Sequence, residues 1–112
     1  SAKRDDVICQ VMAERALGLT TKRVVEESKM SGAPGAATSI FKLVGSSLTK
    51  SGSELKSQLR GTAGLVWDSE DFDQDELDST RGWLRDRAVT IYGGTNEVQQ
   101  NIIAKRVLGL PD

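Results

Sequence analysis

Two glycines and a threonine stand directly before a helical pattern near the end of the chain, in the stretch IYGGTNEVQQNIIAKRVLGLP (91–111). Gly93 and Gly94 carry no Cβ, so another group can approach the backbone closely there. Thr95 is a natural N-cap for the helix that follows, and the free N–H groups at a helix start attract an anion or a ligand carbonyl. Glu97 in the first turn suits the helix dipole. The residues alone leave a ligand site and a plain helix cap equally open.

Seven acidic residues crowd the stretch DSEDFDQDELD (68–78), which raises the question of calcium. Three of them alternate as the opening ligands of an EF-hand loop do, namely Asp71, Asp73 and Asp75. Such a loop needs glycine at its sixth position and glutamate at its twelfth, but this chain has Glu76 and Gly82 there. We therefore expect no metal site. The stretch is interpreted as a solvated acidic loop that brings Asp78 to the N-terminus of a helix.

The other reactive side chains favour structure over catalysis. The chain has no histidine, which excludes a histidine-based triad and a histidine-ligated metal within it. Cys9 is the only cysteine, so no internal disulfide forms and a reducing compartment is favoured. On an apolar helix, Cys9 is expected to be a small buried residue rather than a nucleophile. Trp67 and Trp83 are interpreted as core or interface residues with satisfied N–H groups, and ligand stacking is the alternative.

Helices are expected to position all of these residues. Apolar periodicity, caps and the break at SGAPG (31–35) predict helices over about 5–29, 36–59, 77–92 and 96–108. No stretch alternates as a strand does for more than a few residues. The sequence therefore predicts an all-α fold, a four-helix bundle, in which residues 1–112 form a single domain.

The first expected helix is apolar on several sides. Its apolar residues fall into three groups, which are Ile8, Met12 and Leu19, then Ala13, Leu17 and Val24, then Val7, Val11 and Val25. A helix that is apolar all round is usually buried all round. We therefore expect this helix to be covered on more than one side.

Length and charge set the remaining bounds. The 112 residues (12.1 kDa) suit one modest domain, and the net charge of −1 does not suggest nucleic acid or an anionic membrane. Residues 1–60 carry a charge of +4 and residues 61–112 carry −5, which indicates two faces or a paired surface. No apolar run approaches the ~20 residues of a membrane span. Because helical sequence begins at once and without Met, we expect a C-terminal piece of a longer chain.

Two long stretches resemble one enzyme family. RAVTIYGGTNEVQQNIIAKRVLGLP (87–111) closely resembles the C-terminal signature of the acyl-CoA dehydrogenase family, without gaps. APGAATSIFKLVGSSLTKSGSEL (33–55) is similar to the penultimate long helix of that family, and the whole chain fits its C-terminal helical domain. The resemblance implies that the N-terminal helical domain, the central β domain and the first part of the bundle lie outside these 112 residues.

The resemblance also implies an activity. Members of the family are tetrameric flavoproteins that bind FAD and oxidise an acyl-CoA substrate to the trans-2-enoyl-CoA. A carboxylate removes the α-proton, the β-hydrogen leaves as hydride to the flavin, and an electron-transfer flavoprotein accepts the electrons. Family membership thus implies fatty acid metabolism, a homo- or hetero-oligomer, and the bacterial cytoplasm or the mitochondrial matrix.

Site residues follow from the same resemblance. The Gly94 backbone is expected to lie against the acyl thioester of the substrate. Thr95, Asn96 and Glu97 are expected to contact FAD. QLRGTAG (58–64) resembles the Q-x-x-G-G-x-G corner that holds the adenine end of a neighbouring subunit's FAD, although Thr62 stands where glycine is usual. This assigns further cofactor contacts to Gln58, Leu59, Arg60, Gly61 and Thr62.

The catalytic base is the main departure from the family pattern. Many members carry the catalytic glutamate where this chain has Gly93, and glycine cannot remove a proton. Glu97 is a poor substitute, because it does not occupy the position of Gly93 and a base must lie within hydrogen-bond reach of the proton it takes. Either the base comes from an earlier helix of the domain, or the chain belongs to a non-catalytic partner subunit or assembly module of a mixed tetramer. A free-standing bundle without a ligand would leave the terminal match unexplained.

Overall fold

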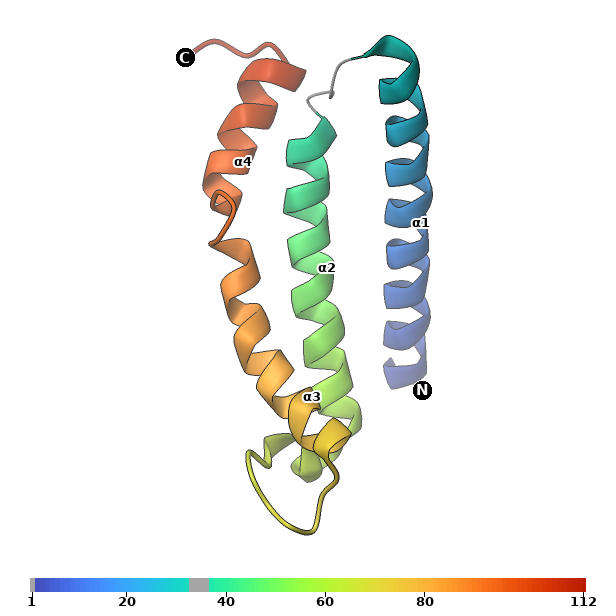
Figure 1. Ribbon diagram of the computed structural model, residues 1–112, viewed down its shortest axis with the longest axis vertical. Coiled ribbons are helices and arrows are strands. Elements are labelled where there is room, and N and C mark those ends of the chain that lie inside the picture. Colours follow the sequence, from blue (N-terminus) through green and yellow to red (C-terminus); the bar gives the residue numbers. More distant parts are fainter. Residues whose placement is uncertain (1, 33–36) are drawn as a thin grey trace.

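The computed structural model of the chain describes residues 2–32 and 37–112, and every regular element in these two ranges is helical. The all-α prediction with four α-helices is confirmed (Figure 1). None of the helices in the two ranges combines the length and apolarity that a membrane crossing requires. The α-helices are α1 (Ala2–Ser31), α2 (Ala37–Leu59), α3 (Gln74–Arg85) and α4 (Asn96–Ile102). Two 3-10 segments, η1 (Gly61–Leu65) and η2 (Asp86–Thr90), and a π-helical turn, η3 (Ile103–Val107), complete the described elements.

Helix α2 is the central element. Helix α1 packs along one side of it, while α3, η2 and α4 follow one another along another side (Figure 1). Segment η1 turns the chain at the lower end of α2, and the acidic loop then leads into α3. Because every other part of the fold packs on α2, the residues of α2 determine which site residues come together.

The expected helix boundaries were partly wrong. The first helix already begins at Ala2 rather than near residue 5. The third begins at Gln74 instead of residue 77, and its α-helical part ends at Arg85, after which the tighter η2 continues to Thr90. The fourth begins at Asn96 as expected and changes to π-helical geometry at Ile103. The expected start of the second helix at residue 36, and residues 33–35 of the expected break, lie outside the described residues.

A capping box starts helix α3. The Asp73 carboxylate accepts a hydrogen bond from the Glu76 N–H at 2.9 Å, and the Glu76 carboxylate accepts one from the Asp73 N–H at 3.1 Å. This arrangement satisfies two N–H groups of the helix start reciprocally. The prediction that Asp78 lies at the helix N-terminus was wrong, because Asp78 is within α3 and Asp73 is the cap.

Asp73→Ala is expected to lower the free energy of unfolding by about 1 kcal/mol, since the N-cap hydrogen bond is lost. A urea titration of the full-length protein, followed by circular dichroism, measures the change. Asp71→Ala is the matched control, because it removes the same charge from an exposed loop position and is expected to stay within about 0.5 kcal/mol of the wild type. Equal effects of the two substitutions would contradict a capping role.

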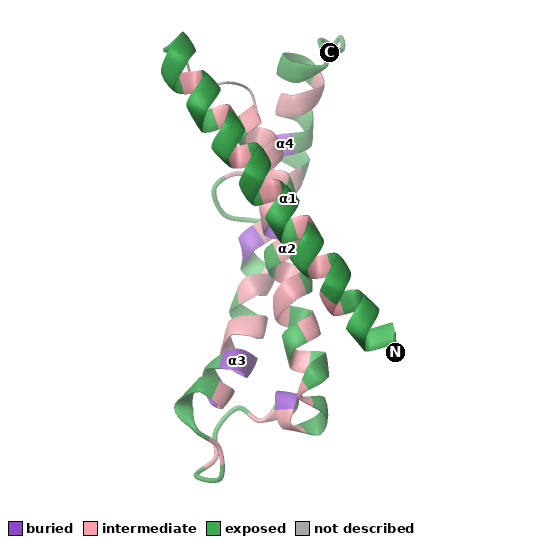
Figure 2. Cartoon of the chain, turned by 90° about the vertical axis from the view of Figure 1, so that its right-hand side faces the viewer, coloured by how far each residue is buried: buried purple, intermediate pink, exposed green. Residues whose placement is uncertain are grey.

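Helix α1 uses one apolar side in this structure. Most of α1 is exposed, with intermediate positions recurring along it (Figure 2). Ala13, Leu17 and Val24 are half-buried, whereas Ile8 is 44% exposed and Met12 65% exposed. The expectation that α1 is covered on several sides is therefore not met by the contacts of this chain, because α2 covers only one side of a cylinder. Cys9 is exposed as well, which corrects the expectation of a buried thiol.

The chain encloses little core. Its accessible surface is 7886 Å², whereas a compact protein of this mass exposes about 6,000 Å². Its radius of gyration is 17.4 Å, against about 13 Å for a compact domain of this length. Among the described residues, only Leu77 and Val89 are buried apolar side chains. An open arrangement of this kind leaves large apolar faces uncovered.

Candidate functional site

The glycine corner, residues 93–95, connects η2 to α4. Gly93 and Gly94 adopt φ angles of 68° and 90°, in the left-handed region that favours glycine. Thr95 is extended, and its hydroxyl oxygen accepts a hydrogen bond from the Val98 N–H at 3.2 Å. The structure thus contains the helix cap that the residues indicated. The contact of Gly94 with an acyl thioester and that of Thr95 with FAD stay predictions.

Two side chains of α4 hold the glycine corner in place. The Gln99 amide donates to the Gly93 carbonyl at 3.2 Å, and Gln99 is only 7% exposed. Asn96 turns toward α2, where its amide oxygen accepts a hydrogen bond from the Ser46 hydroxyl at 3.1 Å. These bonds connect the corner to its own helix and to α2. The corner therefore has a defined shape, and the Asn96 amide oxygen is already engaged within the chain.

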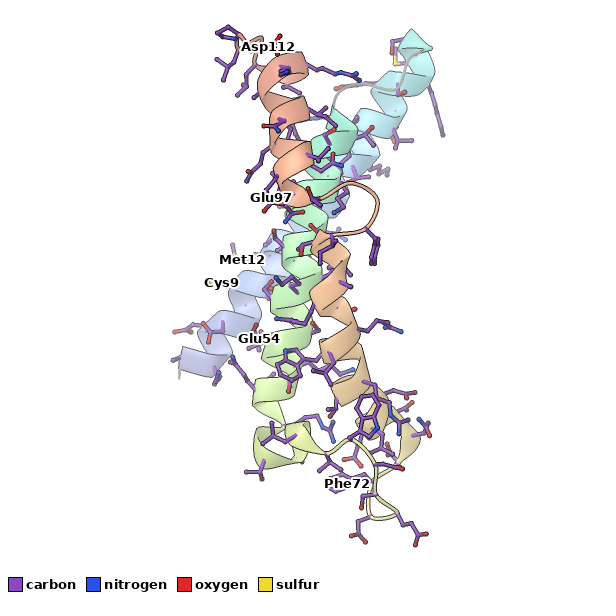
Figure 3. All side chains as sticks on the ribbon, turned by 90° about the vertical axis from the view of Figure 1, so that its left-hand side faces the viewer. Cys9, Met12, Glu54, Phe72, Glu97 and Asp112 are labelled. Carbon is purple, nitrogen blue, oxygen red and sulfur yellow. The ribbon has the colours of Figure 1, made fainter. Side chains whose placement is uncertain are left out.

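Two charged side chains, those of Glu97 and Lys42, lie near the glycine corner in different environments. The Glu97 side chain is exposed at the start of α4 (Figure 3), and its exclusion as the base stays a prediction. Lys42 of α2 lies beneath the corner, since a Cβ atom built on Gly93 would stand 4.0 Å from the Lys42 Cε atom. The Lys42 ammonium is buried and has no hydrogen-bond partner among the described residues. No sequence pattern indicated that this lysine would be buried.

The QLRGTAG corner, residues 58–64, begins with the last two residues of α2 and continues into η1. Gly61 has a φ of 60°, and Gly64 is buried directly against α2. The Gly64 carbonyl accepts hydrogen bonds from the Thr80 hydroxyl at 3.1 Å and the Ser57 hydroxyl at 3.3 Å. Thr80 is only 3% exposed. The last glycine of the motif therefore serves close packing between the corner, α2 and α3.

Arg60 and Leu59 do not face the same space as the other predicted cofactor residues. The Arg60 guanidinium turns to α3, where Nη1 donates to the Glu76 carbonyl and lies 3.4 Å from the Thr80 hydroxyl. Its Nη2 is buried without a partner among the described residues. Leu59 is 55% exposed at the end of α2. Arg60 thus connects the corner to α3, and its cofactor contact, like that of Leu59, stays a prediction.

A pocket of about 560 Å³ opens beside the QLRGTAG corner. Its lining includes three predicted cofactor residues, Gln58, Gly61 and Thr62. Trp83 of α3 also lines it, and the Trp83 indole N–H is buried with no partner among the described residues. The Arg87 guanidinium lies 5.6 Å from the centre of the Trp83 ring. The expectation of a satisfied Trp83 N–H was wrong, because this buried donor has no hydrogen-bond partner among the described residues.

The two corners are far apart. Ser46, which contacts the glycine corner, and Gln58 are separated along α2 by about 18 Å at 1.5 Å per residue. The structure therefore brings the predicted residues together as two groups rather than one. Sequence reasoning missed Lys42, for which no local pattern gave a signal. It included Gly64 within the QLRGTAG motif without a role of its own, and it named Trp83 only as an alternative for ligand stacking.

Comparisons with known proteins give one matching family and several relatives. The family described as acyl-CoA dehydrogenase, C-terminal domain, matches residues 6–108. Acyl-CoA dehydrogenase IpdE1 of Mycolicibacterium smegmatis (strain ATCC 700084 / mc(2)155) is 34% identical over 98% of this chain and 27% of its own length. IpdE1 of Mycobacterium tuberculosis (strain ATCC 25618 / H37Rv) is 36% identical over 99% of this chain and 29% of its own length.

A third relative is more distant. Acyl-CoA dehydrogenase FadE34 of Mycobacterium tuberculosis is 28% identical over 98% of this chain and 14% of its own length. The chain thus spans less than a third of the length of the relatives it matches. No solved structure matches the chain.

Proposed function

Because this chain belongs to the acyl-CoA dehydrogenase family as its C-terminal helical domain, we propose that the full-length protein oxidises an acyl-CoA to the trans-2-enoyl-CoA with FAD. The observation that carries the proposal is the family match over residues 6–108, which includes both glycine corners. At the glycine corner, the backbone of Gly94 contacts the acyl thioester, because glycine lets a ligand approach the main chain. The bound flavin would supply the acceptor for the β-hydrogen.

The residues of both corners suit a flavin nucleotide. Gln58, Gly61 and Thr62 offer an amide and a closely approachable backbone in one pocket, and the Trp83 side chain forms part of its wall. At the other corner, Thr95, Asn96 and Glu97 contact the flavin that serves the same subunit. As the resemblance to the family implies, the QLRGTAG corner contacts the FAD that a neighbouring subunit holds.

The second candidate function is a non-catalytic partner subunit or assembly module of a mixed acyl-CoA dehydrogenase tetramer. It is favoured by Gly93, which stands at the position of the family glutamate and supplies no carboxylate. The exposed Glu97 does not replace it. In the first candidate, the α-proton is removed by a carboxylate from an earlier helix. In the second, the partner subunit carries the base.

Assembly and electron transfer are part of the same proposal. The excess exposed surface of the chain, with α1 apolar on its outer side, supports burial against the rest of the protein and against further subunits of a tetramer. An electron-transfer flavoprotein accepts the electrons. The relatives are bacterial, which favours a cytoplasmic enzyme.

Anaerobic titration of the full-length protein with acyl-CoA thioesters of increasing chain length tests the proposal. Rapid bleaching of the visible flavin spectrum supports a dehydrogenase whose base lies in an earlier helix. A flavin spectrum that persists with every thioester supports the partner-subunit function. A protein that purifies without flavin and does not acquire it from added FAD would contradict both candidates.

The isolated chain of residues 1–112 is expected not to retain FAD, because each corner forms only one wall of a flavin site. Gel filtration of the chain after incubation with FAD, followed by absorbance at the flavin maximum, measures retention. The full-length protein is the control. Stoichiometric flavin in the isolated chain would show that these helices form a complete site, contrary to the proposal.

A further inference from the structure

An unpaired positive charge lies beneath the glycine corner. The Lys42 ammonium is buried, and neither a hydrogen bond nor an ion pair engages it among the described residues. Buried charges in proteins are normally paired, because removal from water without compensation is costly. A functional state in which this ammonium stays alone is therefore unfavourable.

This chain has no carboxylate for Lys42. The structure does not describe Ser1 and residues 33–36, and none of these is Asp or Glu. All 16 acidic residues of the chain therefore lie in the described ranges. Glu97 is the acidic residue nearest to Gly93 in sequence, and its side chain is exposed. In this structure, therefore, no carboxylate of the described residues pairs with the Lys42 ammonium.

The glycine corner leaves room for such a partner. A Cβ atom on Gly93 would meet only the Lys42 Cε atom, at 4.0 Å, within a 4 Å radius of the described residues. One turn further along α2, the Ser46 hydroxyl donates a hydrogen bond to the Asn96 amide oxygen. The face of α2 that carries Lys42 and Ser46 therefore packs against the glycine corner. A group that enters beside Gly93 thus meets a hydrocarbon stem that ends in an ammonium.

We propose that Lys42 is the counter-ion of a carboxylate that enters the glycine corner beside Gly93 and that this chain does not supply. A carboxylate group at this position can come from two sources. It is either a second carboxylate on the acyl group of the substrate, or an acidic side chain from the rest of the protein. The first source rests on the proposed function, whereas the second does not.

Lys42→Met in the full-length protein tests the proposal, because methionine keeps the approximate length of the side chain and removes the charge. Lys56→Met is the matched control on an exposed position of α2. Two quantities are measured, namely the thermal midpoint of the ligand-free protein and the Kd values of adipoyl-CoA and hexanoyl-CoA. These two ligands have six-carbon acyl chains and differ by the terminal carboxylate.

A substrate carboxylate predicts that Lys42→Met raises the midpoint of the ligand-free protein by about 2 °C or more, since an unpaired charge is removed. The same variant then binds adipoyl-CoA about 10- to 100-fold more weakly, the usual range for a lost charged hydrogen bond, and hexanoyl-CoA as the wild type does. A protein carboxylate instead predicts a lower midpoint in Lys42→Met, which Lys42→Arg largely restores.

Three outcomes overturn the proposal. The first is a midpoint and two Kd values that match those of Lys56→Met. The second is a raised thermal midpoint without a selective loss of affinity for adipoyl-CoA, which would show that no anion pairs with Lys42. The third is a lowered midpoint that Lys42→Arg does not restore. A wild-type protein that binds no acyl-CoA contradicts the proposed function, and the midpoints of the variants still decide the role of Lys42.

Discussion

Gly94→Ala is expected to lower the free energy of unfolding of the full-length protein by about 2–4 kcal/mol, the sum of backbone strain and a lost hydrogen bond. The φ of 90° is unfavourable for alanine, and the new Cβ would stand 2.5 Å from the Gln99 amide nitrogen. Gln99 is buried and holds the Gly93 carbonyl, so the amide cannot move aside without losing that bond. Urea unfolding followed by circular dichroism measures the loss.

Gly93→Ala is the matched control for Gly94→Ala. Gly93 also has a positive φ, but its added Cβ meets only the Lys42 stem at an ordinary contact distance. We expect a loss of about 1–2 kcal/mol, from the backbone conformation alone. In a Gln99→Ala background, the penalty of Gly94→Ala should shrink to that of Gly93→Ala, because the clash is gone. An undiminished penalty would show that Gln99 does not determine the shape of the corner.

Gly94→Ala also tests the proposed cofactor site. If the glycine corner contacts flavin and thioester, Gly94→Ala lowers the flavin content of the purified protein and weakens acyl-CoA binding more than Gly93→Ala does. The ratio of absorbance at the flavin maximum to that at 280 nm provides the measurement. Full flavin occupancy together with unchanged acyl-CoA affinity in Gly94→Ala would contradict a ligand contact at this backbone.

Gly64→Ala is expected to cost about 2–4 kcal/mol for a different reason, because the added methyl group overpacks a buried contact and disturbs a hydrogen bond. A Cβ on Gly64 would stand 2.4 Å from the backbone oxygen of Ser57. A backbone atom inside a helix cannot yield as the end of a side chain can. The corner must therefore move away from α2, and the bond from Thr80 to the Gly64 carbonyl weakens with it.

Gly61→Ala separates this packing effect from backbone strain. Gly61 has a φ of 60°, and no described atom lies within 4 Å of an added Cβ. Only the left-handed conformation is penalised, at about 1–2 kcal/mol. The urea midpoints of the two variants provide the comparison. If Gly61→Ala were the more destabilising variant, the close approach of the corner to α2 would not be the reason for glycine at position 64.

The helices show how much of the fold local sequence can predict. The four α-helices were predictable because apolar spacing and caps are local features. The start of α3 was predicted three residues late, although the capping box of Asp73 and Glu76 that begins the helix is itself a local pattern. The change from α to 3-10 geometry after Arg85 depends on how η2 packs on α2, which no local pattern contains.

The surface of α1 illustrates a second limit. The sequence shows three apolar groups, and the structure half-buries Ala13, Leu17 and Val24 together with Val7 of another group. Which of several apolar sides faces a neighbour depends on the crossing of two helices, since ridges of side chains must fit into grooves. Periodicity identified the candidates, and packing selected among them.

The sequence by itself determined the helical class, the Thr95 cap and the glycine corners, because these depend on backbone chemistry within a few residues. Its resemblance to the acyl-CoA dehydrogenase family is confirmed by the match over residues 6–108. Tertiary structure alone decided that the Lys42 ammonium is buried beneath Gly93, and that the Trp83 indole lines a pocket beside Gly61. Residues so far apart in sequence meet only when η2, α3 and α4 pack on α2. The burial that makes a charge or a donor unsatisfied is therefore a property of the packed chain.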